Sequence, residues 1–346
     1  MRDPAPSPRR SGDGRVPAEA VVVVGVHAAQ RRAQAEELAR QSGAWLVPAE
    51  DWGEDGLVPA HALCGGSGAL VLEVPTAVPV AHVIGELADE VDRVRVTAVV
   101  AVACLHTLQA DLASVHARAL VDCLEAATHH ALVGVDAETD GRVGRAGVHE
   151  DTDARRIVAA LRPDALPVGV AAAGAVGAEI DCAGWLRVLN DEWPEDRHVP
   201  GIGVARYERI RPFHRGRLDK LAERWELEAV ARGAAPGGPH SGLRISGLCR
   251  VGDRPEWTWR WDQVGADLQL HPLAADDAVL GLEAGQAPGH GVEADDEGAE
   301  PELLCLGPDL ALFGWGAHVD LTPIVADLDG ALLTDAEFAA GPDAWG

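Results

Sequence analysis

The start of the chain places a buried strand directly before a helix. Four consecutive valines, Val21–Val24, end at Gly25, and a helical pattern then covers residues 30–41. A strand with no polar alternation is covered on both faces, which is typical of a parallel sheet. We therefore expect a strand over residues 20–26 and a helix over residues 30–41, as the first unit of an α/β fold.

Further strands and helices alternate over the next hundred residues. The strongest strand pattern covers residues 94–104. Other strands are expected at residues 43–47, 69–74 and 131–135, and helices at residues 80–92, 112–127 and 151–161. Strands that alternate with helices indicate a parallel sheet with helices on both faces. The sequence thus predicts a doubly wound N-terminal domain.

The pattern changes after Pro194. Residues 204–210 and 243–251 alternate like half-buried strands, and residues 257–261 place three tryptophans on one face of a strand. A last strand is expected at residues 310–315, with helices at residues 217–231 and 321–333. These elements predict a C-terminal α+β domain with an antiparallel sheet. The three tryptophans are expected to pack against helices, the alternative being an exposed protein-binding face.

These patterns also set the expected domain bounds. We expect a disordered tail over residues 1–18, a first domain over residues 19–195 and a second domain over residues 203–346. An acidic loop rich in glycine and proline is expected within the second domain, at residues 283–302.

Composition excludes several functional classes. The formal net charge of −26 argues against nucleic-acid binding, which needs a basic surface. No apolar run approaches the ~20 residues that span a bilayer, and the N-terminal tail has no signal-peptide pattern. We therefore expect a cytoplasmic protein without a membrane partner. None of the six cysteines forms a Cys-x-x-Cys pair, and Cys104 and Cys305 are expected to be small buried side chains.

The residues after the first strand lack the chemistry of a P-loop. A P-loop needs glycines that let backbone N–H groups reach phosphates, a lysine for the β- and γ-phosphates, and a hydroxyl group for Mg²⁺. Gly25 matches the first glycine, but Ala28 and Gln30 replace the next two. Arg31 and Arg32 replace the lysine and the hydroxyl residue, and the chain's single lysine lies far downstream. Because the planar arginine fork does not fit the lysine's position, we expect no productive nucleotide hydrolysis.

The second half carries a resemblance to a known family. Residues 211–218 (RPFHRGRL) resemble the first motif in the C-terminal domain of CobW-type zinc and cobalt metallochaperone GTPases. Segments similar to the family's later motifs follow in the same order, at residues 243–250, 254–255, 261–265, 312–316 and 328–337. The resemblance covers residues 204–340 and implies that the first domain is a degenerate P-loop GTPase domain.

In the first half, the resemblance retains only isolated residues of the family's motifs. The guanine-reading motif falls near residues 133–136 and retains Asp136, which would accept hydrogen bonds from the guanine N1 and N2 groups. The family's cysteine-rich metal motif falls near residues 63–66 and retains Cys64. The expected cofactor-binding residues are therefore vestigial; they are Gly25, Arg31, Arg32 and Asp136. No catalytic residue is assigned.

Histidines give weak metal-binding signals. His61 and Cys64 have a His-x-x-Cys spacing that can bind zinc, and His27 would be a third ligand. The alternative is a loop cysteine beside a solvent-exposed histidine. The pair at residues 129–130 is a weaker ligand candidate. His214 either contacts a partner or bonds a nearby backbone group.

Together these observations predict a CobW-like protein of zinc homeostasis or metallochaperone type. We expect it to act through contacts with a protein partner and without productive GTP hydrolysis. Zinc is the candidate metal, and the binding of Mg²⁺-GTP is doubtful. One alternative is a metallochaperone that still binds GTP weakly. The other is a protein-binding adaptor, for example for ribosome-associated partners under zinc limitation.

Overall fold

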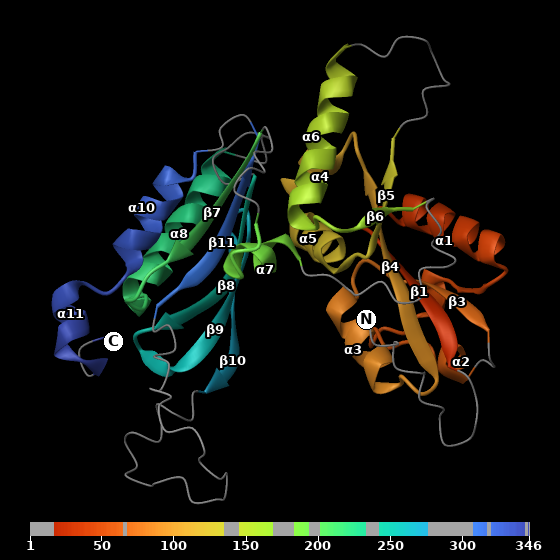
Figure 1. Ribbon diagram of the computed structural model, residues 1–346, viewed down its shortest axis with the longest axis horizontal. Coiled ribbons are helices and arrows are strands. Elements are labelled where there is room, and N and C mark those ends of the chain that lie inside the picture. The colour runs from red at the N-terminus through yellow and green to blue at the C-terminus, as the bar shows by residue number, and fades with distance from the viewer. Residues whose placement is uncertain are drawn as a thin grey trace, which may run out of the picture. The chain divides into compact units, whose positions relative to one another are not determined.

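The chain divides into two compact units, Met1–Ala183 and Gly184–Gly346. The computed structural model describes residues 17–64, 68–134, 145–168, 183–193, 201–232, 242–275, 307–316, 320–342 and 345 (Figure 1). Of the predicted segments, residues 1–16, the acidic loop at residues 283–302 and Cys305 lie outside this description. No helix among the described residues is long and apolar enough to cross a membrane.

The first unit contains a six-stranded sheet in which all neighbouring strands are parallel. Its strands are β1 (Ala18–Val24), β2 (Trp45–Val47), β3 (Ala69–Glu73), β4 (Val94–Cys104), β5 (His129–Val133) and β6 (Leu166–Pro167). Its helices are α1 (Ala28–Ser42), α2 (Ala60–Cys64), α3 (Val80–Asp89), α4 (Leu108–Leu112), α5 (Ala117–Ala126) and α6 (Arg145–Leu161). A short 3-10 helix covers Ala49–Asp51.

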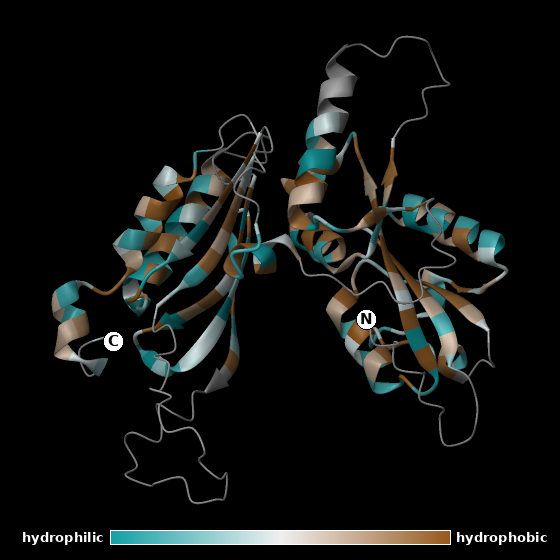
Figure 2. Cartoon of the chain, viewed as in Figure 1, coloured by the Kyte–Doolittle hydropathy of each residue, from teal (hydrophilic) through white to brown (hydrophobic). Residues whose placement is uncertain are grey.

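Helices cover both faces of this sheet (Figure 1). The apolar side of α1, with Leu38 at its centre, packs on β1, β3 and β4. On the opposite face α3 and α5 pack on β4 and on each other. This arrangement follows from the apolar strands, which need cover on two sides. Hydrophobic residues run along the strands in Figure 2, whereas α1 also carries a hydrophilic surface.

The strand order is β2-β3-β1-β4-β5-β6. The chain leaves β1 toward one edge of the sheet and leaves β4 toward the other edge. Adjacent strands whose connections diverge in this way form a topological switch point, and ligands of doubly wound sheets bind beside their carboxyl ends. The carboxyl ends of β1 and β4 are therefore the first place to look for a site.

The second unit contains a five-stranded antiparallel sheet of order β10-β9-β8-β11-β7. Its strands are β7 (Ile202–Glu208), β8 (Leu243–Val251), β9 (Arg254–Val264), β10 (Asp267–Ala275) and β11 (Asp309–Trp315). Its helices are α7 (Gly184–Leu189), α8 (Arg215–Arg232), α10 (Thr322–Ala331) and α11 (Asp335–Ala340). The division between the units precedes the predicted boundary because α7 packs on β8 and β11.

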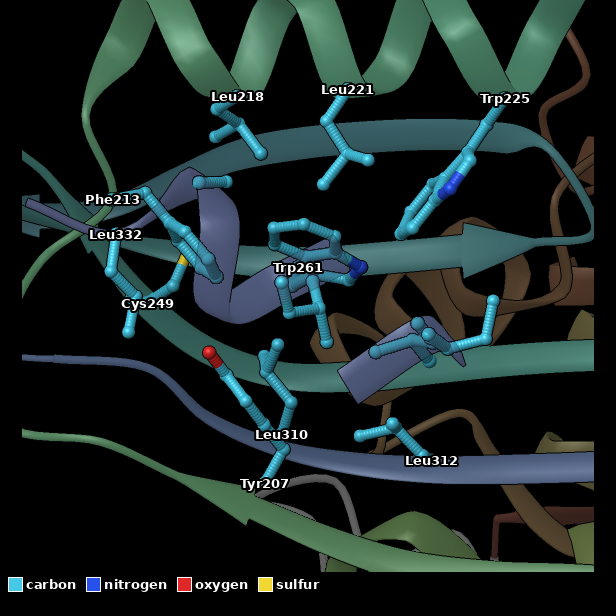
Figure 3. Close-up of a cluster of buried hydrophobic side chains, with 14 of the residues drawn as sticks. Tyr207, Phe213, Leu218, Leu221, Trp225, Cys249, Trp261, Leu310, Leu312 and Leu332 are labelled. Carbon is cyan, nitrogen blue, oxygen red and sulfur yellow. The ribbon is translucent and has the colours of Figure 1, made fainter. Parts of the chain in front are cut away.

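One face of the antiparallel sheet packs against α8 and α10 (Figure 3). Trp261 and Trp225 are fully buried there, and the Phe213 ring lies 5.2 Å from the Trp261 ring. Trp259 packs against the same cluster. The prediction that the tryptophans of residues 257–261 pack in the core is therefore confirmed for Trp259 and Trp261. Side chains from both helices and from the strands meet in a single apolar layer.

The predicted fold class is confirmed. A parallel α/β unit with helices on both faces precedes an α+β unit with an antiparallel sheet. β1 begins at Ala18, two residues before the predicted strand, because Ala18 pairs with Val94 and donates to the carbonyl oxygen of Arg93. Cys104 is buried, as expected.

Candidate functional site

The turn between β1 and α1 contains only three residues, Gly25, Val26 and His27. The backbone N–H of Arg31 already donates to the carbonyl oxygen of His27 at 3.0 Å, which is a helical bond. Ala28 and Gln30 favour helix where glycines would leave the backbone free. The segment that would form the phosphate-binding loop is therefore wound into the first turn of α1.

Gly25 is needed for packing at the end of β1. Its φ angle is +156°, and a Cβ atom there would lie 2.6 Å from the carbonyl oxygen of Val102 on β4. A Cβ atom does not approach a carbonyl oxygen this closely, so the close approach of the two strands requires glycine. This requirement involves no ligand, and it explains the glycine without a phosphate.

The guanidinium of Arg31 is buried and faces its own turn. Its Nη1 donates to the carbonyl oxygen of Gly25 at 2.6 Å and to Thr76 Oγ1 at 2.7 Å. Its Nε lies 3.4 Å from Glu73 Oε1, and both side chains are less than 5 % exposed. Thr76 Oγ1 in turn donates to the carbonyl oxygen of Gly25 at 3.2 Å. These contacts hold the Arg31 charge inside the unit.

Arg32 completes a network around the same carboxylate. Glu73 Oε2 accepts from Arg32 Nη1 at 2.8 Å and from the backbone N–H of Ala49 at 3.2 Å. Arg32 also donates to both carboxylate oxygens of Glu50 and to Glu36. The carboxylates of Glu50, Glu73 and Glu36 raise the pKa of Arg32, and Arg32 lowers the pKa of Glu50. Both oxygens of Glu73 are therefore engaged by guanidinium groups.

Side chains from the turn after β1 and from the start of α4 meet at the switch point. His27 Nε2 lies 2.7 Å from Asp111 Oδ2, and Thr107 Oγ1 donates to the same oxygen at 2.7 Å. These contacts join the turn after β1 to the segment after β4. Burial acts to raise the pKa of the nearby Cys104, but hydrogen bonds, with Thr107 the largest contributor, hold it below its usual range. The crevice where doubly wound sheets bind ligands is thus crossed by a hydrogen-bonded bridge.

The predicted metal site at His61 and Cys64 is described only in part. His61 lies on α2, exposed, with Nε2 3.5 Å from Asp51 Oδ2 and its ring 5.2 Å from the Trp45 ring. Cys64 is the last residue of α2, and its side chain lies outside the description, as does Asp136. No three histidine, cysteine or acidic side chains in the described part of the chain are placed to hold a metal ion.

His129 and His130, the weaker ligand candidates, lie in the core of the first unit. Burial lowers the pKa of His130 to about 4 and also lowers the pKa of His129. His130 Nε2 lies 3.4 Å from the carbonyl oxygen of Leu124, and His129 Nδ1 lies 2.9 Å from Thr128 Oγ1. Both rings are therefore neutral core groups at neutral pH.

His214 caps α8. Its Nδ1 accepts a hydrogen bond from the backbone N–H of Gly216 at 3.1 Å, and its own backbone N–H donates to the carbonyl oxygen of Ala331 at 2.9 Å. The first contact satisfies one of the free N–H groups at a helix start. The interpretation of His214 as a histidine that bonds nearby backbone is confirmed.

The segments that carry the family resemblance meet in the second unit. Arg217 Nη2 lies 2.6 Å from Glu337 Oε2, and Glu337 forms a capping box with Thr334 at the start of α11. The hydrogen bonds from Arg217 and Thr334 hold the pKa of Glu337 at about 2. The Trp345 indole N–H donates to the carbonyl oxygen of Glu337 at 3.0 Å. The residues at 211–218 and 328–337 thus stabilise one another.

Sequence reasoning missed the partners of Arg31 and His27. Glu73 ends β3, Thr76 follows three residues later, and Asp111 lies on α4. A carboxylate at the end of an apolar strand was the available signal for Glu73, because such side chains lie at the ligand-binding edge of a parallel sheet. Asp111 had no comparable signal, because it lies within a helical pattern.

Comparison with known proteins gives a distant structural likeness. No family model matches the chain, and no curated protein matches its sequence. Among solved structures it is similar to the Zn(II)-bound YjiA GTPase from E. coli, with a TM-score of 0.35 and 11% identity over 92% of this chain and 100% of that chain. A Zn(II)-bound triple mutant of YjiA GTPase matches with a TM-score of 0.34, at the same identity and coverage. A likeness of this extent does not assign an activity to the chain.

Proposed function

We propose that this chain is a CobW-like protein of zinc homeostasis that does not hydrolyse GTP and acts through protein contacts. One observation carries the proposal. The side chain at the position of the P-loop lysine, Arg31, is buried and bonded to the carbonyl oxygen of Gly25, with Glu73 beside it. A P-loop lysine has to reach the phosphates instead.

The energetics of the Arg31 network disfavour phosphate binding. A phosphate site needs backbone N–H groups and an available positive charge. To supply that charge, Arg31 would have to leave Glu73, which is 2 % exposed. Breaking one side of a buried ion pair costs roughly 3–5 kcal/mol. A nucleotide would also bring negative charge toward the released carboxylate, which makes the exchange less favourable still.

The same residues also disfavour the binding of Mg²⁺. Mg²⁺ in nucleotide sites is held by oxygen ligands from the protein and from the phosphates. Here the two oxygens of Glu73 face Arg31 and Arg32, and an arginine stands where the hydroxyl ligand belongs. These residues do not fit Mg²⁺-GTP, so no chemical step is assigned to it.

The zinc and partner parts of the proposal rest on the second unit. Residues 211–337 contain segments similar to CobW motifs in the family's order, and Arg217 and Glu337 from the two outermost segments are paired. A protein whose nucleotide chemistry is lost can still use such a domain to bind another protein. The proposal is therefore that it acts on a protein partner.

Phosphate release from Mg²⁺-GTP by the full chain tests the loss of hydrolysis. The matched variants are Arg31→Met and Arg93→Met, because Arg93 forms an exposed pair with Glu90. We expect no release above the protein-free rate for any of the three proteins. Turnover that persists in Arg93→Met and disappears in Arg31→Met would overturn the proposal.

Zinc titration separates the remaining alternatives. Tight zinc binding that His61→Ala and Cys64→Ala each weaken would favour the weak GTP-binding metallochaperone. Capture of a defined protein partner that is unchanged by a chelator would favour the adaptor. The proposal itself expects partner capture through residues 203–346 and a response of that capture to zinc.

A further inference from the structure

The second unit has a groove of about 300 Å³ between α8 and α10. The two helices lie side by side on one face of the antiparallel sheet (Figure 1). Small residues of α10 leave the room for it, because no heavy atom lies within 4 Å of the Cβ position at Gly330. The groove is lined by Arg217, Lys220, Leu221 and Arg224 of α8 and by Ala326, Asp327, Gly330 and Ala331 of α10.

The groove is basic although the chain has a net charge of −26, because three cations and one carboxylate line it. That carboxylate, Asp327, is already engaged: Arg224 Nη2 lies 2.5 Å from its Oδ1, and the Trp225 indole N–H donates to its Oδ2 at 2.9 Å. Arg217 is paired with Glu337 at 2.6 Å. These two pairs hold the arginines in place and compensate their charges.

Lys220 supplies the charge that the pairs leave over. It is the single lysine of the chain, it is exposed, and it has no ion-pair partner in the part of the chain that the structure describes. Arg217 precedes it by three residues and Arg224 follows it by four, so the three cations share one face of α8. A carboxylate from outside the chain can therefore meet Lys220 without separating an existing ion pair.

An exposed apolar pair continues the same surface along α8. Leu227 follows Lys220 by seven residues, so both lie on one side of the helix, and Leu227 is 69 % exposed. Val230, three residues further on, adjoins Leu227 and is 78 % exposed. Neighbouring large apolar side chains on a helix surface indicate a site of interaction. From Lys220 to Val230 the helix rises about 15 Å, or roughly three turns.

We propose that this surface docks an amphipathic helix of a protein partner, with the helix carboxylates at Lys220 and its apolar side chains on Leu227 and Val230. The inference rests on the proposed function, because it names the surface and the partner chemistry for the protein contact. A helix fits a groove between two helices, and it presents anchors at the same spacing as α8. A nucleic acid is disfavoured, because phosphates would meet the acidic chain and would leave the apolar pair uncovered.

Fluorescence anisotropy of labelled peptides with the full chain tests the partner chemistry. The probe is a helical peptide of about 14 residues, with glutamates in its first two turns and leucines in its last two. We expect saturable binding that is several-fold weaker with glutamine for glutamate and about tenfold weaker with alanine for leucine. Absence of saturation, or equal binding of either control peptide, would overturn the proposal. Displacement of the peptide by an equal concentration of single-stranded DNA would show a general polyanion site and would overturn it as well.

Two matched pairs of variants locate the binding. Lys220→Gln is expected to weaken it several-fold, whereas Arg215→Gln removes the same charge from α8 outside the groove lining, at an exposed pair with Asp219, and should leave it unchanged. Leu227→Asp is expected to weaken binding about tenfold, whereas Ile210→Asp, at a side chain that is 74 % exposed and outside α8, should have no effect. Equal effects within either pair contradict the assignment.

The single lysine also allows the docked peptide to be mapped directly. A carbodiimide joins carboxylates to amines in contact, and Lys220 carries the only side-chain amine of the chain. Mass spectrometry should find the glutamates of the peptide coupled to Lys220, and much less of this product with Leu227→Asp. Saturable binding with coupling only to the N-terminal amine would place the peptide elsewhere and refute the inference. If coupling failed while the chain still captured a partner in response to zinc, this surface would be rejected and the proposed function would stand.

Discussion

Arg31 Nη1 donates to the carbonyl oxygen of Gly25 at 2.6 Å, so the residue at the P-loop lysine position bonds the residue at the position of the first P-loop glycine. The contact closes the turn after β1 on itself. Glu73 and Thr76 secure the same guanidinium from the end of β3. The edge of the sheet that commonly binds phosphate is here held together by the protein's own charges.

Replacement of Arg31 by methionine should destabilise the first unit by about 3 kcal/mol. The change leaves Glu73 buried with only Arg32 as its ion-pair partner, and removing one side of a buried pair is strongly unfavourable. Native-state hydrogen exchange of the β1 amides measures the loss.

The control for this prediction is Arg40→Met on the same helix. Arg40 is 71 % exposed and pairs with Glu37, so its loss should change the free energy of unfolding far less than the loss of Arg31, because solvent screens an exposed pair. Equal effects of the two substitutions would show that the buried network contributes little.

Gly25→Ala should destabilise the first unit by roughly 2–4 kcal/mol without any nucleotide present. The new Cβ would lie 2.6 Å from the carbonyl oxygen of Val102, so β1 and β4 would have to separate. Gly43→Ala is the comparison, because Gly43 has a positive φ angle but open space around its Cβ position. Hydrogen exchange of the β4 amides should show the larger loss in Gly25→Ala, and a larger loss in Gly43→Ala would refute the packing role.

His214→Ala should lower the stability of the second unit by about 1 kcal/mol, the usual contribution of a helix cap. His214→Asn restores a side chain that can accept from the Gly216 N–H, so it should recover most of the loss. Urea unfolding followed by tryptophan fluorescence measures both. If asparagine were no better than alanine, the cap would not be the source of the effect.

The buried His130 should make the first unit less stable as the pH falls. Its folded pKa of about 4 lies below the ordinary value of 6.5, so the unfolded chain binds more protons between these values. Stability is therefore full above pH 6.5 and declines as the pH falls toward 4. His129 acts in the same direction, because burial lowers its pKa as well.

Comparison of pH 7.5 and pH 5.0 tests this dependence. The His130 contribution to the loss should be on the order of 2 kcal/mol at pH 5.0. His130→Gln cannot titrate in this range, so its unfolding free energy should change correspondingly less between the two conditions. Urea unfolding followed by circular dichroism gives the unfolding free energy of each protein at both pH values. An equal loss between pH 7.5 and pH 5.0 in the two proteins would contradict the assignment.

Apolar runs made most of the fold predictable from the sequence. The strands at residues 94–104 and 243–251 have the predicted bounds, because long apolar or alternating runs leave little choice of structure. The predicted helix over residues 112–127 corresponds to α5, which begins only at Ala117, because α4 ends at Leu112 and a turn separates the two helices. Ser114 Oγ donates to the carbonyl oxygen of Asp111 and accepts from the His116 N–H, which stabilises a turn that periodicity does not reveal.

β10 had no clear pattern. It is an edge strand, and its pairing with β9 shifts register between Pro272 and Ala274. Proline is confined to edge strands and bulges, so a proline within a run of residues argues against a strand when only the sequence is known. Leu268 and Leu270 nevertheless pack against the core of the second unit.

The contacts at the candidate site were not predictable from the sequence. The spacing after Gly25 indicated that a P-loop was missing, but not where the arginines would go. Arg31 meets Glu73 because β1 and β3 pair in parallel, and His27 meets Asp111 because β1 also pairs with β4. Contacts between residues so far apart in the chain depend on the strand order, which no local pattern contains.

Calorimetric titration of the full chain with Mg²⁺-GTP tests the central claim most directly. The account predicts no saturable heat up to millimolar nucleotide, for the unaltered chain and for Arg31→Lys alike, because α1 already begins at Ala28 and leaves no loop for the phosphates. Micromolar binding by the unaltered chain would mean that Arg31 leaves Glu73 to hold phosphate, and it would contradict the account.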